Sequence, residues 1–148
     1  MVLTLVVPDE YSYVLAAVTS TFFVNTVHMF RTSKLRKASG IKYPNAYASD
    51  EQAKKDPAAY TFNCAQRAHN NYTENQTSLI GGALIAGLRY PVPAAVLAAT
   101  WAAGRVVYLF GYTSSAGPSG RVAGGIFASL SDVVLKCMAA YTVYKMIV

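Results

Sequence analysis

The sequence predicts an all-α integral membrane protein whose four transmembrane helices form an antiparallel, up-and-down bundle. The first observation is composition: 14% of the 148 residues are charged and 53% are apolar, whereas soluble domains carry about a quarter charged residues. The second is distribution, because the apolar residues gather in long uncharged runs. The third is the position of the charge, since seven of the thirteen lysines and arginines fall between residues 31 and 55.

The length suits a single membrane domain over residues 1–148. Residues 11–30 carry no charge, and about 20 apolar residues suffice to cross the hydrocarbon of a bilayer. The three later segments qualify when a few polar residues are allowed inside them. The helices are expected at about residues 10–36, 57–88, 93–112 and 121–146.

The expected helix ends carry local signals. Acidic residues precede the first helix, where negative charge suits the helix dipole, and Gly40 breaks it. Asp56 followed by Pro57 marks the start of the second helix, because Asp caps helices well and Pro is tolerated in the first turn. We expect residues 40–56 to form the only long loop.

The basic residues between the first two helices predict the orientation. Cytosolic loops of membrane proteins are rich in Lys and Arg, which places residues 37–56 and 113–120 in the cytosol and both termini on the opposite side. This pattern explains the net charge of +6 better than nucleic-acid binding, which needs a basic face on a folded domain. Residues 1–7 lack the basic stretch of a cleavable signal peptide, so the first helix should remain in the mature protein.

Polar residues cluster inside the second and third helices. Three residues of the second helix are spaced i, i+4 and i+7: Arg67, Asn71 and Glu74. Three residues of the third helix are spaced i, i+3 and i+7: Arg105, Tyr108 and Tyr112. Each set shares one helix face. Because the two helices run in opposite directions, both faces should lie about 9 to 13 Å below the cytosolic boundary and open towards it.

Charges at this depth cost a few kcal/mol each unless they are paired or solvated. In the structural interpretation, Arg67 and Glu74 pair within their own helix and Arg105 extends to the membrane boundary. In the functional interpretation, the cluster is a water-filled pocket for a small zwitterionic ligand, whose carboxylates bind arginine and whose ammonium binds Glu74.

Other chemistry-bearing residues have simpler explanations. His28 is expected to form an interhelical hydrogen bond rather than to bind a ligand. Two histidines 41 residues apart, with no cluster of carboxylates nearby, make a metal site improbable, and no metal is expected. Cys64 and Cys137 are expected as small buried thiols. Asp132 and Lys136, spaced i, i+4, should pair with each other.

Two segments carry a family resemblance. Residues 62–74 read FNCAQRAHNNYTE, and residues 104–112 read GRVVYLFGY. They resemble the second-helix and third-helix motifs of the MAPEG family, the membrane-associated proteins in eicosanoid and glutathione metabolism. The resemblance covers residues of about 10–140. The pattern Ser33-Lys34, Arg36-Lys37 and Tyr43-Pro44 is most similar to the branch of microsomal glutathione S-transferase type three.

The resemblance implies a homotrimer of four-helix subunits, with glutathione bound as a co-substrate between adjacent subunits. The residues that match glutathione-binding positions are Arg36, Arg67, His69, Asn71, Glu74, Arg105, Tyr108 and Tyr112. Arg121 occupies the place of the arginine that activates the thiol, and Tyr108 and Arg105 are the further catalytic candidates. The transfer to Arg121 is the least direct, since the loop before it differs in length from its relatives.

The function implied is a membrane-bound glutathione transferase that acts on lipophilic electrophiles and also reduces lipid hydroperoxides. It would reside in the endoplasmic reticulum membrane, with the mitochondrial outer membrane as an alternative. Asn75 stands where the leukotriene-C synthase branch has a tyrosine, and Gln76-Thr77 replaces an aromatic-proline pair, which argues against a dedicated leukotriene synthase. Two other functions remain open: a non-enzymatic lipid-binding scaffold resembling five-lipoxygenase-activating protein, and a structural membrane subunit.

Overall fold

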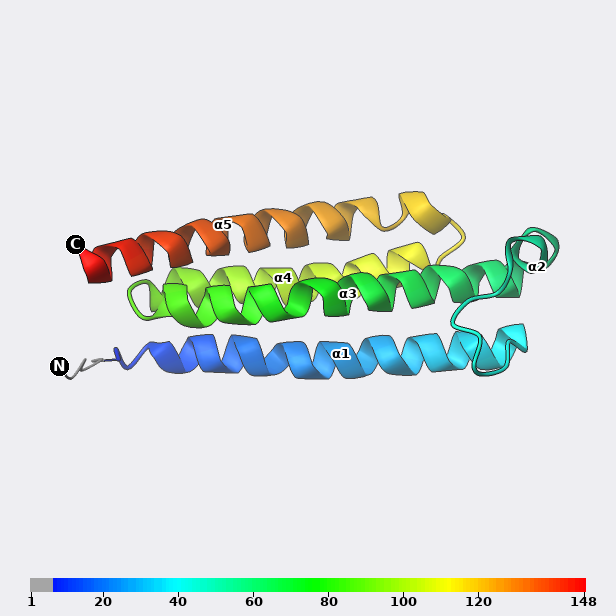
Figure 1. Ribbon diagram of the computed structural model, residues 1–148, viewed down its shortest axis with the longest axis horizontal. Helices are drawn as coiled ribbons and strands as arrows, with labels where there is room; N and C mark the ends of the chain where they lie inside the picture. The colour runs from blue at the N-terminus through cyan, green and yellow to red at the C-terminus, as the bar shows by residue number, and fades with distance from the viewer. Residues whose placement is uncertain (1–6) are drawn as a thin grey trace.

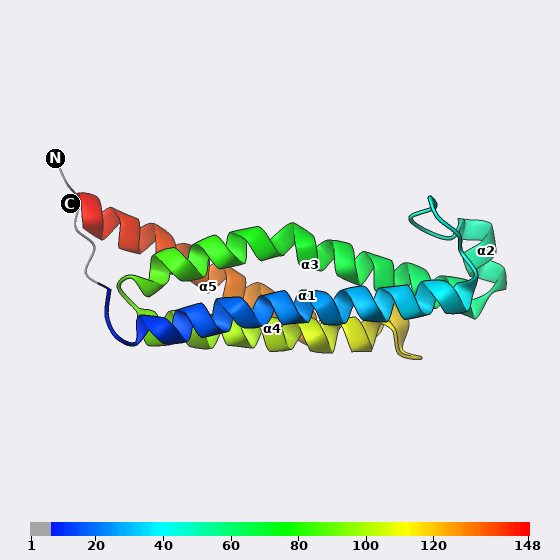
Figure 2. The same cartoon turned by 90° about the horizontal axis from the view of Figure 1, so that it is seen from below.

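The structure, a computed structural model, describes residues 7–148 as a bundle of four long helices (Figure 1). The expectation about a signal peptide falls largely on residues 1–6, outside this range. The elements are α1 (Tyr11–Ser39), α2 (Asp50–Lys55), α3 (Pro57–Gly87), α4 (Pro91–Tyr112), the 3-10 turn η1 (Gly117–Ser119) and α5 (Val122–Ile147). Long helices that follow one another in the chain run in opposite directions, and α1 and α5 lie on opposite sides of the α3–α4 pair (Figures 1 and 2).

The helix ends confirm most of the local signals. α1 ends at Gly40, whose φ of 67° is the left-handed conformation that glycine adopts without strain. At the start of α3, the carboxylate of Asp56 accepts a hydrogen bond from the backbone N–H of Ala58 at 2.8 Å. α4 begins at Pro91, two residues earlier than expected, because two prolines fit the first turn, where no N–H is required.

The loop between α1 and α3 contains a short helix that the sequence analysis missed. α2 begins after Ser49, whose hydroxyl accepts a hydrogen bond from the N–H of Gln52 at 3.2 Å. The side chain of Gln52 accepts one in return from the N–H of Ser49 at 3.0 Å. This reciprocal capping box stabilises the first turn, so residues 40–56 are only partly a loop.

Glycines let α4 and α5 approach at backbone contact. A Cβ atom on Gly124 would lie 2.4 Å from the backbone N of Tyr108 and 2.5 Å from the carbonyl O of Gly104. One on Gly111 would lie 2.0 Å from the carbonyl O of Gly120. No side chain fits at these contacts, so the two helices meet through their glycines.

Within residues 7–148, three segments are long and apolar enough to cross a membrane: Tyr11–Ser39, Pro91–Tyr112 and Gly117–Ile147. α3 is of similar length but lies outside this set, because its polar residues lower its mean hydropathy. Composition alone therefore accounts for three of the four expected crossings. The outer surface is apolar along these segments, as large side chains of α5 such as Phe127 and Leu130 are more than half exposed.

Candidate functional site

A cavity of about 390 Å³ lies where α3, α4 and the start of α5 meet. Its polar lining comes from four of the residues singled out in the sequence: Asn71, Arg105, Tyr108 and Arg121. Its apolar and small lining comes from the first turns of α5: Val122, Gly125, Ile126 and Ser129. The cavity thus combines cationic and hydrogen-bonding groups with apolar and small side chains.

Arg105 is a buried arginine, with 4% of its surface exposed. Its Nη1 donates a hydrogen bond to Oδ1 of Asn71 at 2.6 Å, so the polar faces of α3 and α4 meet at the same level of the bundle. Its guanidinium carbon lies 5.0 Å from the ring centre of Trp101 and 5.5 Å from that of Tyr108, at cation–π range. The interpretation in which Arg105 extends to the membrane boundary is therefore wrong.

The guanidinium of Arg105 is incompletely satisfied. Among the residues that the structure describes, it forms no ion pair with a carboxylate, and its Nε has no hydrogen-bond partner. A buried cation without a carboxylate is costly. An anionic group in the adjoining cavity would supply the missing partner.

Arg121 is held against the tyrosines of α4. Its Nη1 donates a hydrogen bond to the hydroxyl oxygen of Tyr108 at 3.0 Å, and its guanidinium carbon lies 5.1 Å from the ring centre of Tyr112. Because Tyr108 accepts this bond, its own O–H remains available to donate. A cation and a phenol donor therefore meet at one wall of the cavity, placed there by the glycine contacts between α4 and α5.

Arg67 and Glu74 lie apart from this cavity. Nη1 of Arg67 lies 3.1 Å from Oε1 of Glu74, and each side chain is about half exposed on the surface of α3. This is the internal pair of the structural interpretation. Neither residue lines the cavity in the single chain, and Tyr112 borders it only through Arg121.

Arg36 and His69 line a second cavity, of about 220 Å³, between α1 and α3. Nη1 of Arg36 donates to the carbonyl O of Asn45 at 2.7 Å, and Nη2 donates to that of Ala46 at 3.4 Å. Nδ1 of His69 is buried and has no partner. The predicted site residues therefore form two groups, one on either side of α3.

The structure adds residues that the sequence analysis did not assign to the site. Trp101 is fully buried, and its ring lies at cation–π range of the guanidinium of Arg105. Because the two residues are spaced i, i+4 on one helix, the sequence could have predicted this contact. His28 is buried, and its Nε2 lies 3.3 Å from the carbonyl O of Arg105, which confirms its expected interhelical role. Asp132 pairs with Lys136 as expected.

A known protein family matches most of the chain. Residues 14–141 match the MAPEG family. This chain belongs to the MAPEG family. Membership of a membrane family agrees with the three apolar helices, and the protein is a membrane protein. The MAPEG family includes glutathione transferases and also members without enzymatic activity, so membership alone does not decide the reaction.

Proposed function

We propose that this protein is a membrane-bound glutathione transferase of the type-three branch that conjugates glutathione to lipophilic electrophiles. The observation that carries the proposal is the cavity in which Arg121 and the hydroxyl of Tyr108 converge beside the unpaired guanidinium of Arg105. We further propose that it reduces lipid hydroperoxides, in which two glutathione molecules become the disulfide while the hydroperoxide becomes an alcohol and water.

The proposed chemistry centres on the thiolate of glutathione. A free thiol with a pKa near 8.5 is only a few per cent ionised at neutral pH. Arginine stays charged at any relevant pH, so Arg121 can stabilise the thiolate without competing for its proton. The O–H of Tyr108 donates a second bond to the sulfur. The thiolate then attacks the electrophilic carbon, a C–S bond forms, and the leaving group departs with the bonding electrons.

The charged residues suit the other groups of the tripeptide. Arg105 would bind a carboxylate, and Asn71 would bind a peptide amide. Arg67 and Glu74, paired on an exposed surface, offer one cation and one anion to the ammonium and carboxylate of the γ-glutamyl end. The tripeptide would replace each partner of this pair with a charge of the same sign, so neither side chain would be left unpaired within the membrane.

We propose a homotrimer in which glutathione lies between subunits. The site residues lie on two sides of α3, and this division supports the arrangement. The residues around Arg105 and Arg121 in one subunit could form a complete site with Arg36 and His69 of a neighbouring subunit. His69 would contribute directly. Arg36 would reach a carboxylate by releasing its longer bond, the one of 3.4 Å to Ala46.

We propose four crossings, with α3 as the fourth, in the endoplasmic reticulum membrane or alternatively the mitochondrial outer membrane. α3 lies beside α1 and α4 along the bundle, so it shares their depth (Figure 1). Cysteine labelling at Ser49 tests the orientation: reagent applied from the cytosol should react, and reaction from the lumen alone would contradict it.

Titration of the purified protein with glutathione separates the enzyme from its two rivals. The enzyme binds glutathione, whereas a lipid-binding scaffold does not. In a structural subunit, Glu74→Gln changes the stability of the oligomer and nothing binds. We expect saturable binding by calorimetry, weakened in Glu74→Gln. No detectable binding at millimolar glutathione would contradict the proposal.

A further inference from the structure

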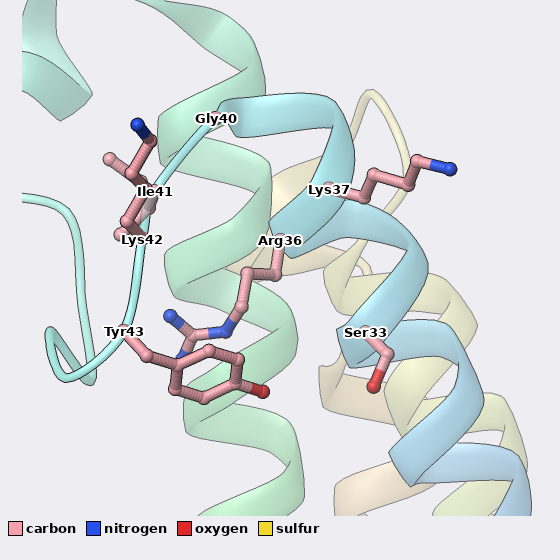
Figure 3. A pocket seen from close by; sticks show the side chains of 7 residues that line it. All are labelled: Ser33, Arg36, Lys37, Gly40, Ile41, Lys42 and Tyr43. Atoms are coloured by element: carbon pink, nitrogen blue, oxygen red, sulfur yellow. The ribbon is translucent and has the colours of Figure 1, made fainter.

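The hollow at the end of α1 belongs to the region already described. It measures about 430 Å³, and three of its lining residues, Ser33, Arg36 and Tyr43, also line the cavity that His69 borders. Arg36 lies beside Tyr43 there (Figure 3), with its guanidinium carbon 4.3 Å from the centre of that ring and 4.5 Å from that of Phe62. A charged pair that the proposed reaction leaves unused lies elsewhere, on α5.

Asp132 and Lys136 form this ion pair within α5. The ammonium of Lys136 bonds the carboxylate one turn earlier, so it lies near the level of Asp132. At about 1.5 Å per residue, Asp132 lies about 15 Å from the first residue of α5 and about 22 Å from the last. A hydrocarbon layer of about 30 Å centred on this helix therefore places the ammonium about 10 Å inside it, where a charge needs partners.

The two side chains of the pair differ in exposure. Asp132 is 9% exposed, whereas Lys136 is 49% exposed. An ammonium has three N–H donors, and within residues 7–148 the carboxylate of Asp132 is the one acceptor that Lys136 contacts. Because the pair is neutral as a whole and still has free donors, it suits an uncharged oxygen acceptor better than a second carboxylate.

Lys136 lies on the face of α5 that lines the cavity at Arg121. The cavity is lined by four α5 residues spaced i, i+3, i+4 and i+7: Val122, Gly125, Ile126 and Ser129. Val133 and Lys136 continue this face at i+11 and i+14. Ile126 and Val133 are 60% and 55% exposed, so a largely apolar strip, open in the single chain, leads from the cavity to the ammonium.

We propose that Lys136 determines the specificity for the acceptor substrate by donating hydrogen bonds to an uncharged oxygen on its chain, a hydroxyl or a carbonyl. The inference rests on the proposed glutathione chemistry, because the reacting carbon lies with the thiolate at Arg121. The chain follows Ile126 and Val133, and Asp132 neutralises the ammonium that binds the oxygen.

The helix sets the position of this oxygen on the substrate. Arg121 precedes Asp132 by about 16 Å along the helix axis, at about 1.5 Å per residue. An extended hydrocarbon chain advances about 1.3 Å per carbon, so the oxygen belongs about 12 carbons from the reacting carbon. The preferred acceptors are therefore long oxygenated chains rather than plain hydrocarbon electrophiles.

Conjugation kinetics of the detergent-purified full chain test the proposal with three acceptors of equal chain length and equal reactive group. The probes are octadec-2-enal and its derivatives with a hydroxyl on carbon 15 or on carbon 9, which lie about 12 and about 6 carbons from the carbon that glutathione attacks. In wild type, kcat/KM for the 15-hydroxy acceptor should exceed that for the other two about 10-fold, the scale of one hydrogen bond from a charged donor.

The variant Asp132→Leu/Lys136→Leu removes the pair as a unit. Replacing a buried ion pair by apolar residues often leaves a protein as stable as before or more stable, so this variant should melt at or above the wild-type temperature. Its preference for the 15-hydroxy acceptor should disappear. The matched control is Lys145→Leu, which removes a lysine from the last turn of the same helix and should keep the preference.

The outcomes separate this inference from the proposed function. Turnover by wild type with equal kcat/KM for the three acceptors would overturn the inference and leave the proposed function standing. An unchanged preference in Asp132→Leu/Lys136→Leu, or an equal loss in Lys145→Leu, would overturn it as well. Absence of turnover with all three acceptors would overturn the proposed function and the inference with it. The wild-type comparison needs no variant, so it is decisive even if the double variant does not fold.

Discussion

Arg105 and Arg36 are two arginines of the same chain in opposite situations. Arg105 is buried among helices, forms one hydrogen bond to Asn71 and leaves its Nε without a partner. Arg36 lies at the edge of the bundle with both terminal nitrogens bonded to loop carbonyls and its plane between two aromatic rings. The first has donors available for a ligand, whereas the second already holds a loop. Both side chains are cationic, so the difference that favours Arg105 as the stronger ligand of glutathione is its available hydrogen-bond donors.

The largest expected effect comes from disturbing the helix contact that positions Arg121. Gly124→Ala places a methyl group against the backbone of Tyr108 and Gly104, and overpacking of this kind costs about 1 to 3 kcal/mol or more. We expect a lower melting temperature in detergent and loss of glutathione binding. The matched control is Gly81→Ala, where a Cβ meets nothing within 4 Å, and it should melt at or above the wild-type temperature. Equal melting of both variants would refute the close contact.

Removing the arginine with available donors should weaken binding strongly. Arg105→Gln deletes a charged hydrogen-bond donor, which is worth about 1.5 to 3 kcal/mol, so the dissociation constant of glutathione should rise about 10- to 100-fold. Calorimetry measures this constant, and the exposed Arg89→Gln is the control of equal charge change. If both variants bind like wild type, Arg105 is only a structural cation.

Removing Arg36, whose donors are already occupied, should weaken glutathione binding less than removing Arg105, but it should loosen the loop after α1. Arg36→Ala should raise the dissociation constant of glutathione about threefold to fivefold, since only its weaker bond is available to a ligand. Limited proteolysis should cut residues 41–47 faster, because the stacking and both carbonyl bonds are lost, whereas Lys34→Ala should leave cleavage unchanged. Binding loss as large as that of Arg105→Gln, with an unchanged loop, would contradict the distinction.

The helices were predictable because their signals are local. Pro57 after Asp56, Gly40 and the uncharged run of α1 each act within a few residues of their position. α2 was also predictable in principle, as Ser49 and Gln52 are spaced as a capping box, but a loop was the simpler expectation there. The spacings on α3 and α4 also predicted that Arg105 and Asn71 would lie on facing sides of the two helices, at the same level of the bundle.

The sequence could not predict that the candidate site residues would be divided between two sides of α3. Spacing tells which residues share a helix face, but the neighbour of that face depends on how helices pack. Arg67 and Asn71 share a face, yet Asn71 enters the cavity while Arg67 pairs with Glu74 outside it. The positions of Arg36 and His69 on the far side of α3 likewise depend on the packing of α1.

The most direct test of the account is the ionisation of bound glutathione. Arg121 is proposed to stabilise the thiolate, with Arg105 and Asn71 holding the tripeptide, and thiolate absorbance measures the ionised fraction as a function of pH. In Arg121→Ala the apparent pKa of the bound thiol should rise towards that of a free thiol, about 8.5, and kcat should fall about 100-fold while the dissociation constant changes little. Coincident titration curves for wild type and Arg121→Ala would contradict the account and leave thiol activation to Arg105 or a tyrosine of α4.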